Sequence, residues 1–327
     1  SQSRGLGDVY KRQILSRRIT KVEWKIMKKD RMLITGGCGF IGSHFTDFQM
    51  GYVDMEVIVV DKLTYASNID YLPEGAKLIK KDINDLTYDD IGEIQYCVNF
   101  AAESHVDNSI DDGSPFVKTN VNGTFNLLEL CRQMKNFKKF VQISTDEVYG
   151  DVKEPSIETD VLKPSSYYSA TKAAADQIVL AAGKTYELPY LITRSCNNYG
   201  DRQHEEKFLP KLFKCYKEQM AFPLYGDGLN RREWIWVGDN IRIIDLLTHS
   251  PNHYGIYNVG TGDIWCNVDI VDEVTMLTEG GINFQQVDDR LGHDRAYWLD
   301  CYKLEHELGY YPTMNLGKYL QDTFKWV

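Results

Sequence analysis

No stretch of the sequence stays apolar over the roughly 18 residues that a membrane-spanning helix needs, so a membrane protein is not expected. Cysteines never occur as C-x-x-C, and their number, seven, is odd. Neither a zinc site nor a disulfide framework is therefore expected, and reduced thiols in the cytoplasm are the simplest interpretation. Basic residues are few, 37 against 47 acidic ones, which gives a net charge of −10. A nucleic-acid-binding protein would need a basic face, so the charge balance argues against that class.

The rest of the composition is that of a folded chain. Its 327 residues are 43% hydrophobic and 12% aromatic, enough apolar surface for one large domain or two modest ones. Residues 1–30 differ, because they hold nine Lys or Arg and three Asp or Glu, a local charge of +6. We expect this segment to be a non-native or disordered extension, with an organelle transit peptide as the alternative, and leave it out of the fold.

From residue 32 onward, short apolar runs alternate with helix-like stretches. The runs are almost continuously apolar, as in parallel strands that are covered on both faces. The candidate strands are Met32–Thr35, Glu56–Asp61, Lys77–Asp82, Tyr96–Ala101, Phe140–Thr145 and Tyr190–Arg194. The candidate helices are Ile41–Met50, Pro115–Met134 and Tyr168–Tyr186. This alternation predicts an α/β fold with a Rossmann-type doubly wound parallel sheet, and the looser pattern after residue 195 predicts a smaller C-terminal domain that binds the substrate.

Three glycines, Gly36, Gly39 and Gly42, follow the first candidate strand and open a helix. This spacing allows a sharp turn, a close approach of backbone N–H groups to a pyrophosphate, and tight packing of the helix on the strand. The second candidate strand ends at Asp61, whose carboxylate can accept hydrogen bonds from a ribose and repel a 2′-phosphate. The pattern therefore predicts a dinucleotide site that prefers NAD to NADP, a preference that the adjacent Lys62 weakens slightly.

Tyr168 and Lys172 form a Y-x-x-x-K pair on a candidate helix, where residues i and i+4 share a face. A cation beside the phenol favours the phenolate, so we expect a lowered pKa for Tyr168 and a role as a base. The fifth candidate strand leads into Thr145, Asp146 and Glu147. Ligands bind at the carboxyl ends of parallel strands, and two adjacent carboxyls there suit acid–base work because their proximity separates their pKa values.

Nine ordered sequence blocks carry a resemblance to a known family. They are TGGCGFIGS (35–43), DKLTYASN (61–68), AAESHVD (101–107), TNVNGTFNLLE (119–129), STDEVYG (144–150), YSATK (168–172), RSCNNYG (194–200), LYGDGLNRREW (224–234) and DRLGHDRAY (289–297). Together they resemble the extended short-chain dehydrogenase/reductase family and, within it, the dTDP-glucose 4,6-dehydratases, from about residue 32 to the end. The Thr-Asp-Glu triplet is the discriminating feature, since related epimerases and decarboxylases keep the Tyr and Lys but usually lack the acidic pair.

The resemblance implies an NAD-dependent lyase that converts dTDP-glucose or UDP-glucose to the 4-keto-6-deoxy sugar nucleotide and water. Tyr168, held by Lys172, would remove the C4 hydroxyl proton while hydride passes to NAD, from which it later returns to C6. Glu147 would remove the C5 proton, and Asp146 would protonate the departing C6 hydroxyl. Thr145 would hydrogen-bond the C4 oxygen. Rhamnose-type deoxysugars are one destination of such a product.

The resemblance also implies which residues surround the two ligands, with no metal among them. The NAD contacts fall on Gly36, Gly39, Phe40, Ile41, Gly42, Asp61, Lys62, Thr64, Asp82, Ile83, Ala101, Ala102, Thr119, Tyr168 and Lys172. The nucleotide-sugar contacts fall on Ser104, His105, Asn197, Glu206, Lys207, Asn230, Arg232, Asn267, Arg290 and His293. The expected domains are an NAD-binding Rossmann domain over 31–195, with a returning segment at about 227–260, and a nucleotide-sugar-binding domain over 196–226 and 261–327.

The sequence departs from the close family pattern mostly in segments that should face the substrate. Tyr167, Asp201, Glu205 and Leu291 stand where proline is usual, Arg231 replaces a small apolar residue, and Asn240 replaces a histidine. These departures leave the reaction type intact and the choice between dTDP-glucose and UDP-glucose open. An epimerase and a non-catalytic NAD-binding regulator are the alternatives. A homodimer is expected through the helices near 119–134 and 168–186.

Overall fold

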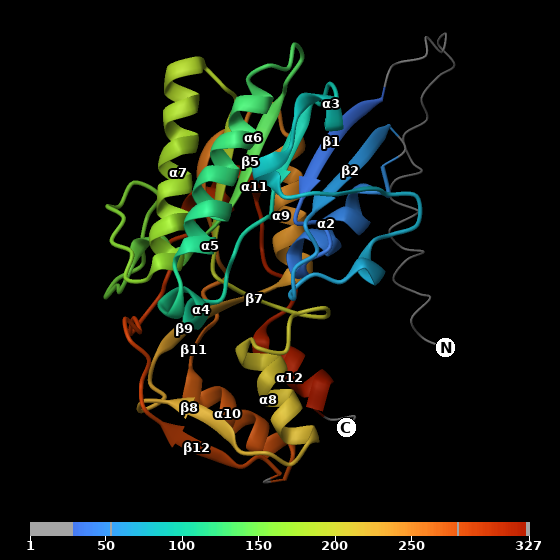
Figure 1. Ribbon diagram of the computed structural model, residues 1–327. Helices are drawn as coiled ribbons and strands as arrows, with labels where there is room; N and C mark the ends of the chain where they lie inside the picture. The colour runs from blue at the N-terminus through green and yellow to red at the C-terminus, as the bar shows by residue number, and fades with distance from the viewer. Residues whose placement is uncertain (1–28, 53, 280, 325–327) are drawn as a thin grey trace.

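The computed structural model describes residues 29–52, 54–279 and 281–324, and its main element is a parallel sheet (Figure 1). The seven strands have the order β10-β6-β5-β4-β1-β2-β3, and every pairing is parallel. They are β1 (Asp30–Thr35), β2 (Met55–Asp61), β3 (Lys77–Lys80), β4 (Tyr96–Asn99), β5 (Lys139–Thr145), β6 (Tyr190–Ser195) and β10 (Gly255–Val259). The order runs outward from β1 in both directions, so the predicted Rossmann-type α/β sheet is confirmed.

Both faces of this sheet are buried, because successive residues of each strand enter different cores. In β1, Leu33 packs in one core and Ile34 in the other. In β2, the same alternation separates Ile58 from Val59. Apolar, mostly β-branched runs form these strands because such side chains fit a pleated surface that is covered from both sides.

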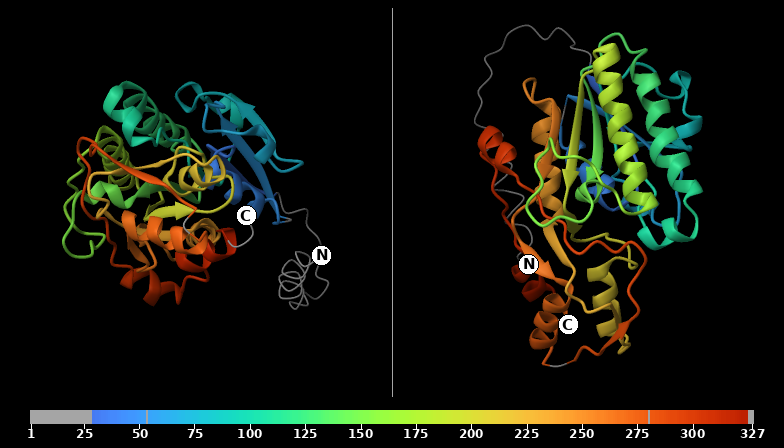
Figure 2. Two further views of the ribbon diagram at one scale, coloured as in Figure 1. Left: turned by 90° about the horizontal axis from the view of Figure 1, so that it is seen from below. Right: turned by 90° about the vertical axis from the view of Figure 1, so that its left-hand side faces the viewer.

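Different helices cover the two faces, as Figure 2 shows. Helices α2 (Phe40–Gln49) and α9 (Val237–His249) contact each other over one face, and α6 (Thr124–Cys131) packs beside α7 (Tyr167–Tyr186) over the other. Shorter helical segments lie in the connections. They are η1 (Ile69–Tyr71), η2 (Ile83–Asp85), α3 (Tyr88–Ile91), α4 (Val106–Asp111), α5 (Ser114–Phe116), η3 (Val117–Gly123), η4 (Asp146–Tyr149) and α11 (Tyr302–Leu308).

A smaller lobe lies below the large sheet in Figure 1 and has a core of its own, which includes Leu212, Ile270 and Leu320. A three-stranded sheet in it has the order β11-β9-β7, and a two-stranded sheet pairs β12 with β8. The elements of this lobe are β7 (Asn197–Tyr199), α8 (Phe208–Lys217), β8 (Phe222–Tyr225), β9 (Arg231–Trp236), β11 (Ile264–Cys266), α10 (Asn267–Leu277), β12 (Phe284–Val287) and α12 (Leu316–Phe324). After β9 the chain returns to the large sheet through α9 and β10.

Some elements differ from their predicted bounds for local reasons. The third strand ends at Lys80, because Asp82 instead caps η2, where its Oδ1 accepts from the backbone N–H of Asn84 at 2.9 Å. The helix predicted over 115–134 is divided among α5, η3 and α6, and η3 is π-helical. The extension predicted over 1–30 lies outside the described residues except at its last two positions.

A buried ion pair ties α7 to β6. The Nε of Arg194 donates to Oδ2 of Asp176 at 3.0 Å, and the two side chains are 2% and 0% exposed. The Nη1 of Arg194 also donates to the Tyr149 hydroxyl at 2.8 Å. A guanidinium in such a place is tolerated only while its partners remain, because an isolated charge is poorly solvated in the interior.

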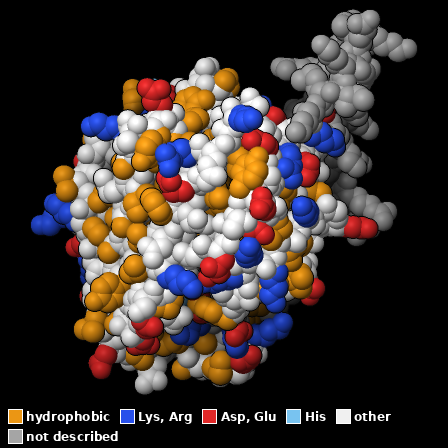
Figure 3. Space-filling model, turned by 45° about the horizontal axis from the view of Figure 1, so that its top comes forward, with side chains coloured by type: hydrophobic (Ala, Val, Ile, Leu, Met, Phe, Trp, Pro, Cys, Tyr) orange, Lys and Arg blue, Asp and Glu red, His pale blue; other side chains and the backbone are white. Residues whose placement is uncertain are grey.

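The surface of the molecule is mixed in character. In the view of Figure 3, hydrophobic side chains lie scattered between acidic and basic ones rather than in one continuous area. Among the described helices, none combines the length and the apolar character needed to cross a membrane.

We expect the change Asp176→Ala to lower the free energy of unfolding by about 3–5 kcal/mol, because it leaves the Arg194 charge buried without its partner. The matched control is Asp322→Ala, which breaks a surface pair with Lys318 and should change stability by less than about 1 kcal/mol. Urea unfolding followed by circular dichroism measures both. Equal losses in the two variants would contradict the role given to the buried pair.

Candidate active site

A cavity of about 350 Å³ opens where β1, β2, β4 and β5 end. Every residue that the sequence predicts to contact a dinucleotide lines its wall, from the glycine loop at 36–42 to Tyr168 and Lys172 on α7. The parallel topology explains this, because the carboxyl ends of neighbouring strands meet at one edge of the sheet. The individual contacts to NAD remain predictions.

The glycine loop is shaped by two close approaches. Gly36 has φ +67°, and a Cβ on it would lie 2.7 Å from the backbone nitrogen of Ala101. A Cβ on Gly42 would lie 2.2 Å from the carbonyl oxygen of Gly36. Any larger residue at either position would therefore push the loop away from the strands that it follows.

The cavity has the chemistry that a dinucleotide requires. Helix α2 begins at Phe40, its N-cap residue Gly39 offers no side-chain cap, and its first turn holds no acidic residue, so its N–H groups suit a diphosphate. Asp61 lies at the end of β2, and its carboxylate accepts from the backbone N–H of Cys38 at 3.0 Å and of Leu63 at 2.8 Å. These bonds fix the carboxylate on the cavity wall, where a ribose diol would reach it. The residues therefore fit NAD.

Lys62, which the sequence suggested would weaken the preference for NAD, is engaged elsewhere. Its Nζ lies 2.8 Å from Oε1 of Glu103 and 3.2 Å from Oγ1 of Thr119. The ion pair offsets the positive charge that a 2′-phosphate would need, so the effect of Asp61 dominates this part of the wall.

Helix α7 begins with a capping box that fixes its first turn. The backbone N–H of Ser169 donates to Oγ of Ser166 at 3.1 Å, and that of Ser166 donates to Oγ of Ser169 at 3.0 Å. Tyr168 follows in this turn, and Lys172 lies one turn later. The Nζ of Lys172 donates to the carbonyl oxygen of Ile143 at 2.5 Å. This bond holds the helix against the end of β5.

The lowered pKa predicted for Tyr168 is wrong for this structure. Desolvation by the surrounding protein raises the pKa of the Tyr168 phenol well above its usual value, and the Glu147 carboxylate raises it further. Burial also lowers the pKa of Lys172, to about 8. Desolvation and the nearby carboxylate thus keep Tyr168 a neutral phenol at neutral pH, while Lys172 is mostly charged.

A second cavity, of about 380 Å³, adjoins the first and is lined mainly by the smaller lobe. The residues common to both walls are Ser104, Glu147, Asn197, Glu206, Lys207, Phe208 and Trp234. The other predicted substrate residues that line the second cavity are His105, Arg232, Asn267, Arg290 and His293. Asn230 lines neither cavity, because its Nδ2 turns to the carbonyl oxygen of Asp294 at 3.2 Å.

The two carboxyls after β5 have different surroundings. Glu147 stands at the junction of the cavities, whereas Asp146 is buried behind it and lines neither. The hydroxyl of Thr145 donates to Oδ1 of Asp146 at 3.0 Å, and within the described chain Oδ2 of Asp146 has no hydrogen-bond partner. Burial, followed by the charges of Glu147 and Glu233, raises the pKa of Asp146 well above its ordinary value.

Glu147 also has a raised pKa, again because of burial, but the positive charges of Arg232 and Lys207 oppose the rise. Asp146 has a weaker set of opposing charges and a second carboxylate, Glu233, beside it. Glu147 therefore ionises more readily than Asp146.

Sequence reasoning missed several aromatic residues on the walls. Tyr225, Trp234 and Tyr297 all lie within sequence blocks that carried the resemblance, so those blocks held a signal for them. The Arg232 guanidinium stacks over the Tyr297 ring at 4.2 Å from its centre. Phe208 and Phe222 had no such signal, because only the packing of α8 and β8 brings them to the cavity.

A family model described as GDP-mannose 4,6 dehydratase matches residues 33–323. The chain belongs to this family. The GDP-mannose 4,6 dehydratase family includes members of the extended short-chain dehydrogenase/reductase group, so the resemblance seen in the sequence is confirmed.

Several relatives match this chain over most of its length. The low-salt glycan biosynthesis protein Agl12 of Haloferax volcanii is 41% identical over 86% of this chain and 93% of its own. The dTDP-glucose 4,6-dehydratase of Streptomyces griseus is 38% identical over 90% of this chain and 93% of its own. The crystal structure of DesIV, a dTDP-glucose 4,6-dehydratase from Streptomyces venezuelae with NAD and dTDP bound, superposes with a TM-score of 0.85 at 39% identity, over 90% of this chain and 96% of that one.

We expect Asp61→Ala to weaken NAD binding by about 10- to 100-fold, because a ribose would lose hydrogen bonds to a charged acceptor. Asp61→Asn, which keeps a side chain able to hold the loop, should chiefly reduce the discrimination against NADP. Calorimetric titration with NAD and with NADP measures both effects. Unchanged NAD affinity in Asp61→Ala would show that the ribose assignment is wrong.

Proposed function

We propose that this protein is an NAD-dependent nucleotide-sugar 4,6-dehydratase, a lyase that converts dTDP-glucose or UDP-glucose to the 4-keto-6-deoxy sugar nucleotide and water. The observation that carries the proposal is the position of Glu147 at the junction of the two cavities. A sugar held there would present its ring to Tyr168 on one side and to this carboxylate on the other. Dehydration needs such a base, and the relatives named above that act on dTDP-glucose support the assignment.

The first cavity is the place for the dinucleotide. The N–H groups at the start of α2 would hold the diphosphate, Asp61 the adenosine ribose, and Asp82 and Ile83 the adenine side. NAD, when bound, supplies a hydride acceptor for the sugar C4 carbon and a hydride donor for C6. The same NAD serves the next turnover, so the protein should retain it.

Tyr168 takes the proton from the C4 hydroxyl as a phenolate. Because burial raises the pKa of this phenol, the phenolate forms only after the phenol has given its own proton to solvent, and this requires positive charge in the occupied site, to which Lys172 contributes from the next turn of α7. Thr145, at the end of β5, is placed to hydrogen-bond the C4 oxygen. These three residues thus orient and deprotonate the sugar at C4.

The acidic pair then carries out the elimination. Once C4 is a carbonyl, the C5 proton is acidic, and Glu147, the more readily ionised of the two carboxyls, removes it. Asp146, whose raised pKa favours the protonated form, gives its proton to the C6 hydroxyl, and water leaves. Asp146 lines neither cavity, so this role requires its side chain to turn toward the sugar.

The two alternative functions, an epimerase and a non-catalytic NAD-binding regulator, leave some of these residues without a role. Epimerisation at C4 needs neither a C5 base nor a C6 acid, so an epimerase gives Asp146 and Glu147 no role. A non-catalytic NAD-binding regulator would give none to Tyr168 and Lys172, which the structure brings together on one cavity wall.

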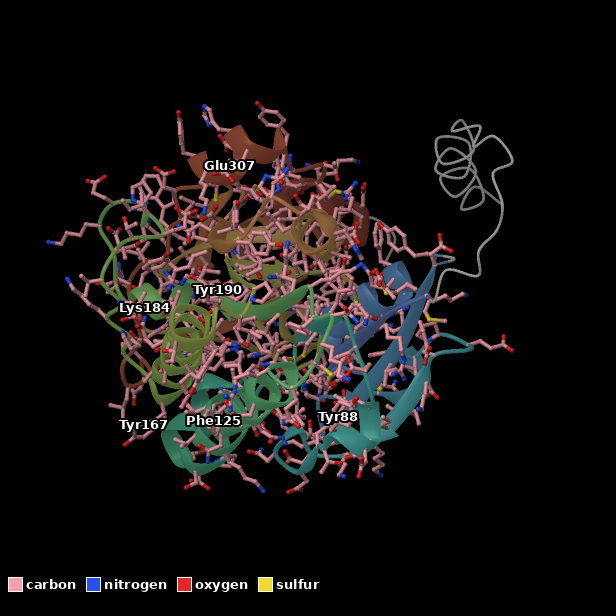
Figure 4. The ribbon with its side chains drawn as sticks, turned by 90° about the horizontal axis from the view of Figure 1, so that it is seen from above. Tyr88, Phe125, Tyr167, Lys184, Tyr190 and Glu307 are labelled. Atoms are coloured by element: carbon pink, nitrogen blue, oxygen red, sulfur yellow. The ribbon has the colours of Figure 1, made fainter. Side chains whose placement is uncertain are left out.

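We also propose a homodimer formed through the outer side of α6 and α7. Phe125 and Tyr186 are 55% and 52% exposed, and Figure 4 shows Phe125 and Tyr167 at the edge of the molecule. Paired with the same helices of a second copy, this face would make a four-helix contact.

A cytoplasmic location and a role in making rhamnose-type deoxysugars complete the proposal. The seven cysteines support a cytoplasmic location, because none of them forms a disulfide in the described structure.

The test of the proposed function offers the purified protein dTDP-glucose and UDP-glucose in separate reactions. Mass spectrometry of the sugar nucleotide should show the loss of one water from one of them, with dTDP-glucose preferred. Such a loss would also identify the nucleotide. Intact sugars in both reactions, from protein that holds NAD, would favour an epimerase instead.

We expect Glu147→Gln to lower the rate of water loss by about 10²–10⁴-fold, because the amide cannot accept the C5 proton. NAD and sugar-nucleotide binding should persist, and solvent deuterium should no longer enter C5. The matched control is Glu154→Gln, the same change at an exposed site outside both cavities, which should retain full activity. Full turnover by Glu147→Gln would remove Glu147 from the mechanism.

A further inference from the structure

Residues 201–207, called the strap here, join β7 to α8 along the edge of the first cavity. Gln203, His204, Glu206 and Lys207 line its wall. In Figure 1 this stretch passes below α2, on the side of the smaller lobe. The strap therefore belongs to one lobe in sequence and faces the dinucleotide cavity of the other.

One end of the strap is fastened to α2. The Nη2 of Arg202 lies 2.6 Å from Oδ2 of Asp47, and its Nη1 donates to Oγ of Ser43 at 3.2 Å. The imidazole Nε2 of His44 lies 2.9 Å from the carbonyl oxygen of Asp201. All three partners belong to the helix whose N-terminus is the proposed diphosphate site.

The other end is fastened to the loops that follow β2 and β4. The Tyr65 hydroxyl donates to Oε1 of Glu206 at 3.4 Å, and the Tyr65 ring meets the His204 ring edge-on at 5.3 Å. The Nζ of Lys207 donates to the carbonyl oxygen of Ser104 at 2.9 Å. The strap thus runs along the cavity wall, held at one end by α2 and at the other by the loops after β2 and β4.

The backbone of the strap adopts its path because of these anchors. Arg202 has φ +67°, a left-handed conformation that non-glycine residues rarely adopt without surrounding contacts that hold them there. Asp201 and Glu205 stand where proline is usual in the close family pattern, so the chain lacks the stiffening that proline would give. Side-chain contacts, several of them ionic, take over that task.

We propose that the strap is a clasp that retains the dinucleotide and that Arg202 and Tyr65 are its two positioning residues. Neither side chain needs to touch NAD. Each holds the strap closed over the cavity, and NAD can leave only when both ends come free. The inference rests on the proposed function in that NAD is the ligand, but it concerns the rate of release rather than the reaction.

The test measures release directly, without any sugar. Wild-type protein and the variants Arg202→Gln, Tyr65→Phe and Lys214→Gln are loaded with radiolabelled NAD, and loss of label into excess unlabelled NAD is followed by filtration. Lys214→Gln is the matched control, because Lys214 on α8 pairs with Glu205 at 2.9 Å and so ties the strap to its own lobe.

We expect Arg202→Gln and Tyr65→Phe to release label about threefold to tenfold faster than the wild type, the range for losing a few partly exposed polar contacts. Lys214→Gln should match the wild type. Added salt should speed release from the wild type and have little effect on Arg202→Gln, since screening weakens the ionic anchor that the variant lacks. The thermal midpoint of the NAD-free protein should be the same in all four.

Wild-type release rates in both Arg202→Gln and Tyr65→Phe would overturn the clasp. Equal acceleration in Lys214→Gln would overturn it as well, because general loosening of the loop would then explain the effect. A wild type that retains NAD but dehydrates neither sugar nucleotide would contradict the proposed reaction and leave the clasp standing. A wild type that binds no NAD would contradict both.

Discussion

The hydrogen bond from the Lys172 ammonium to the Ile143 carbonyl oxygen is the contact on which the active site depends. It crosses from α7 to β5 beside the carboxyl end of the strand, and it fixes how far the helix stands from Thr145 and Glu147. One turn further along the helix, the Arg194–Asp176 pair ties α7 to the neighbouring strand β6. Because both links are buried, α7 cannot slide along the sheet without exposing a charge to an apolar interior.

This anchoring accounts for the charge states in the site. Lys172 is held among protein atoms that lower its pKa to about 8, so it stays charged at neutral pH but only by a small margin. Burial and the neighbouring carboxylates raise the pKa of the Asp146 carboxyl and so favour its protonated form. The Arg232 and Lys207 side chains of the smaller lobe support the ionised form of Glu147. The charge states of these groups are therefore set by burial and by the approach of the smaller lobe, not by residue type alone.

Features that depend on local spacing could be predicted from the sequence, whereas features that depend on burial and on distant contacts could not. The glycine loop and Asp61 depend on spacing within a few residues of a strand end, and the Y-x-x-x-K pair depends on spacing within one helical turn. Both kinds of spacing are visible in a sequence. The π-helical turn of η3 was not foreseeable, because an altered hydrogen-bond register leaves no mark in an apolar pattern. The turn of Asn230 toward the Asp294 backbone and the raised pKa of Tyr168 arise from contacts between segments far apart in the chain. Motif position carries no information about such contacts.

The late return of the chain to the large sheet has a consequence for synthesis on the ribosome. Six of the seven strands are complete by residue 195, yet the edge strand β10 and the covering helix α9 come only after much of the smaller lobe. Until then, the apolar side of the sheet that α9 will cover, including Ile34 and Val59, has α2 as its main cover. A nascent chain paused in this interval would expose the apolar face of an incomplete sheet. A chaperone that binds exposed apolar surface would bind such an intermediate. The large sheet, which carries the dinucleotide cavity, can therefore be completed only after much of the smaller lobe has been synthesised.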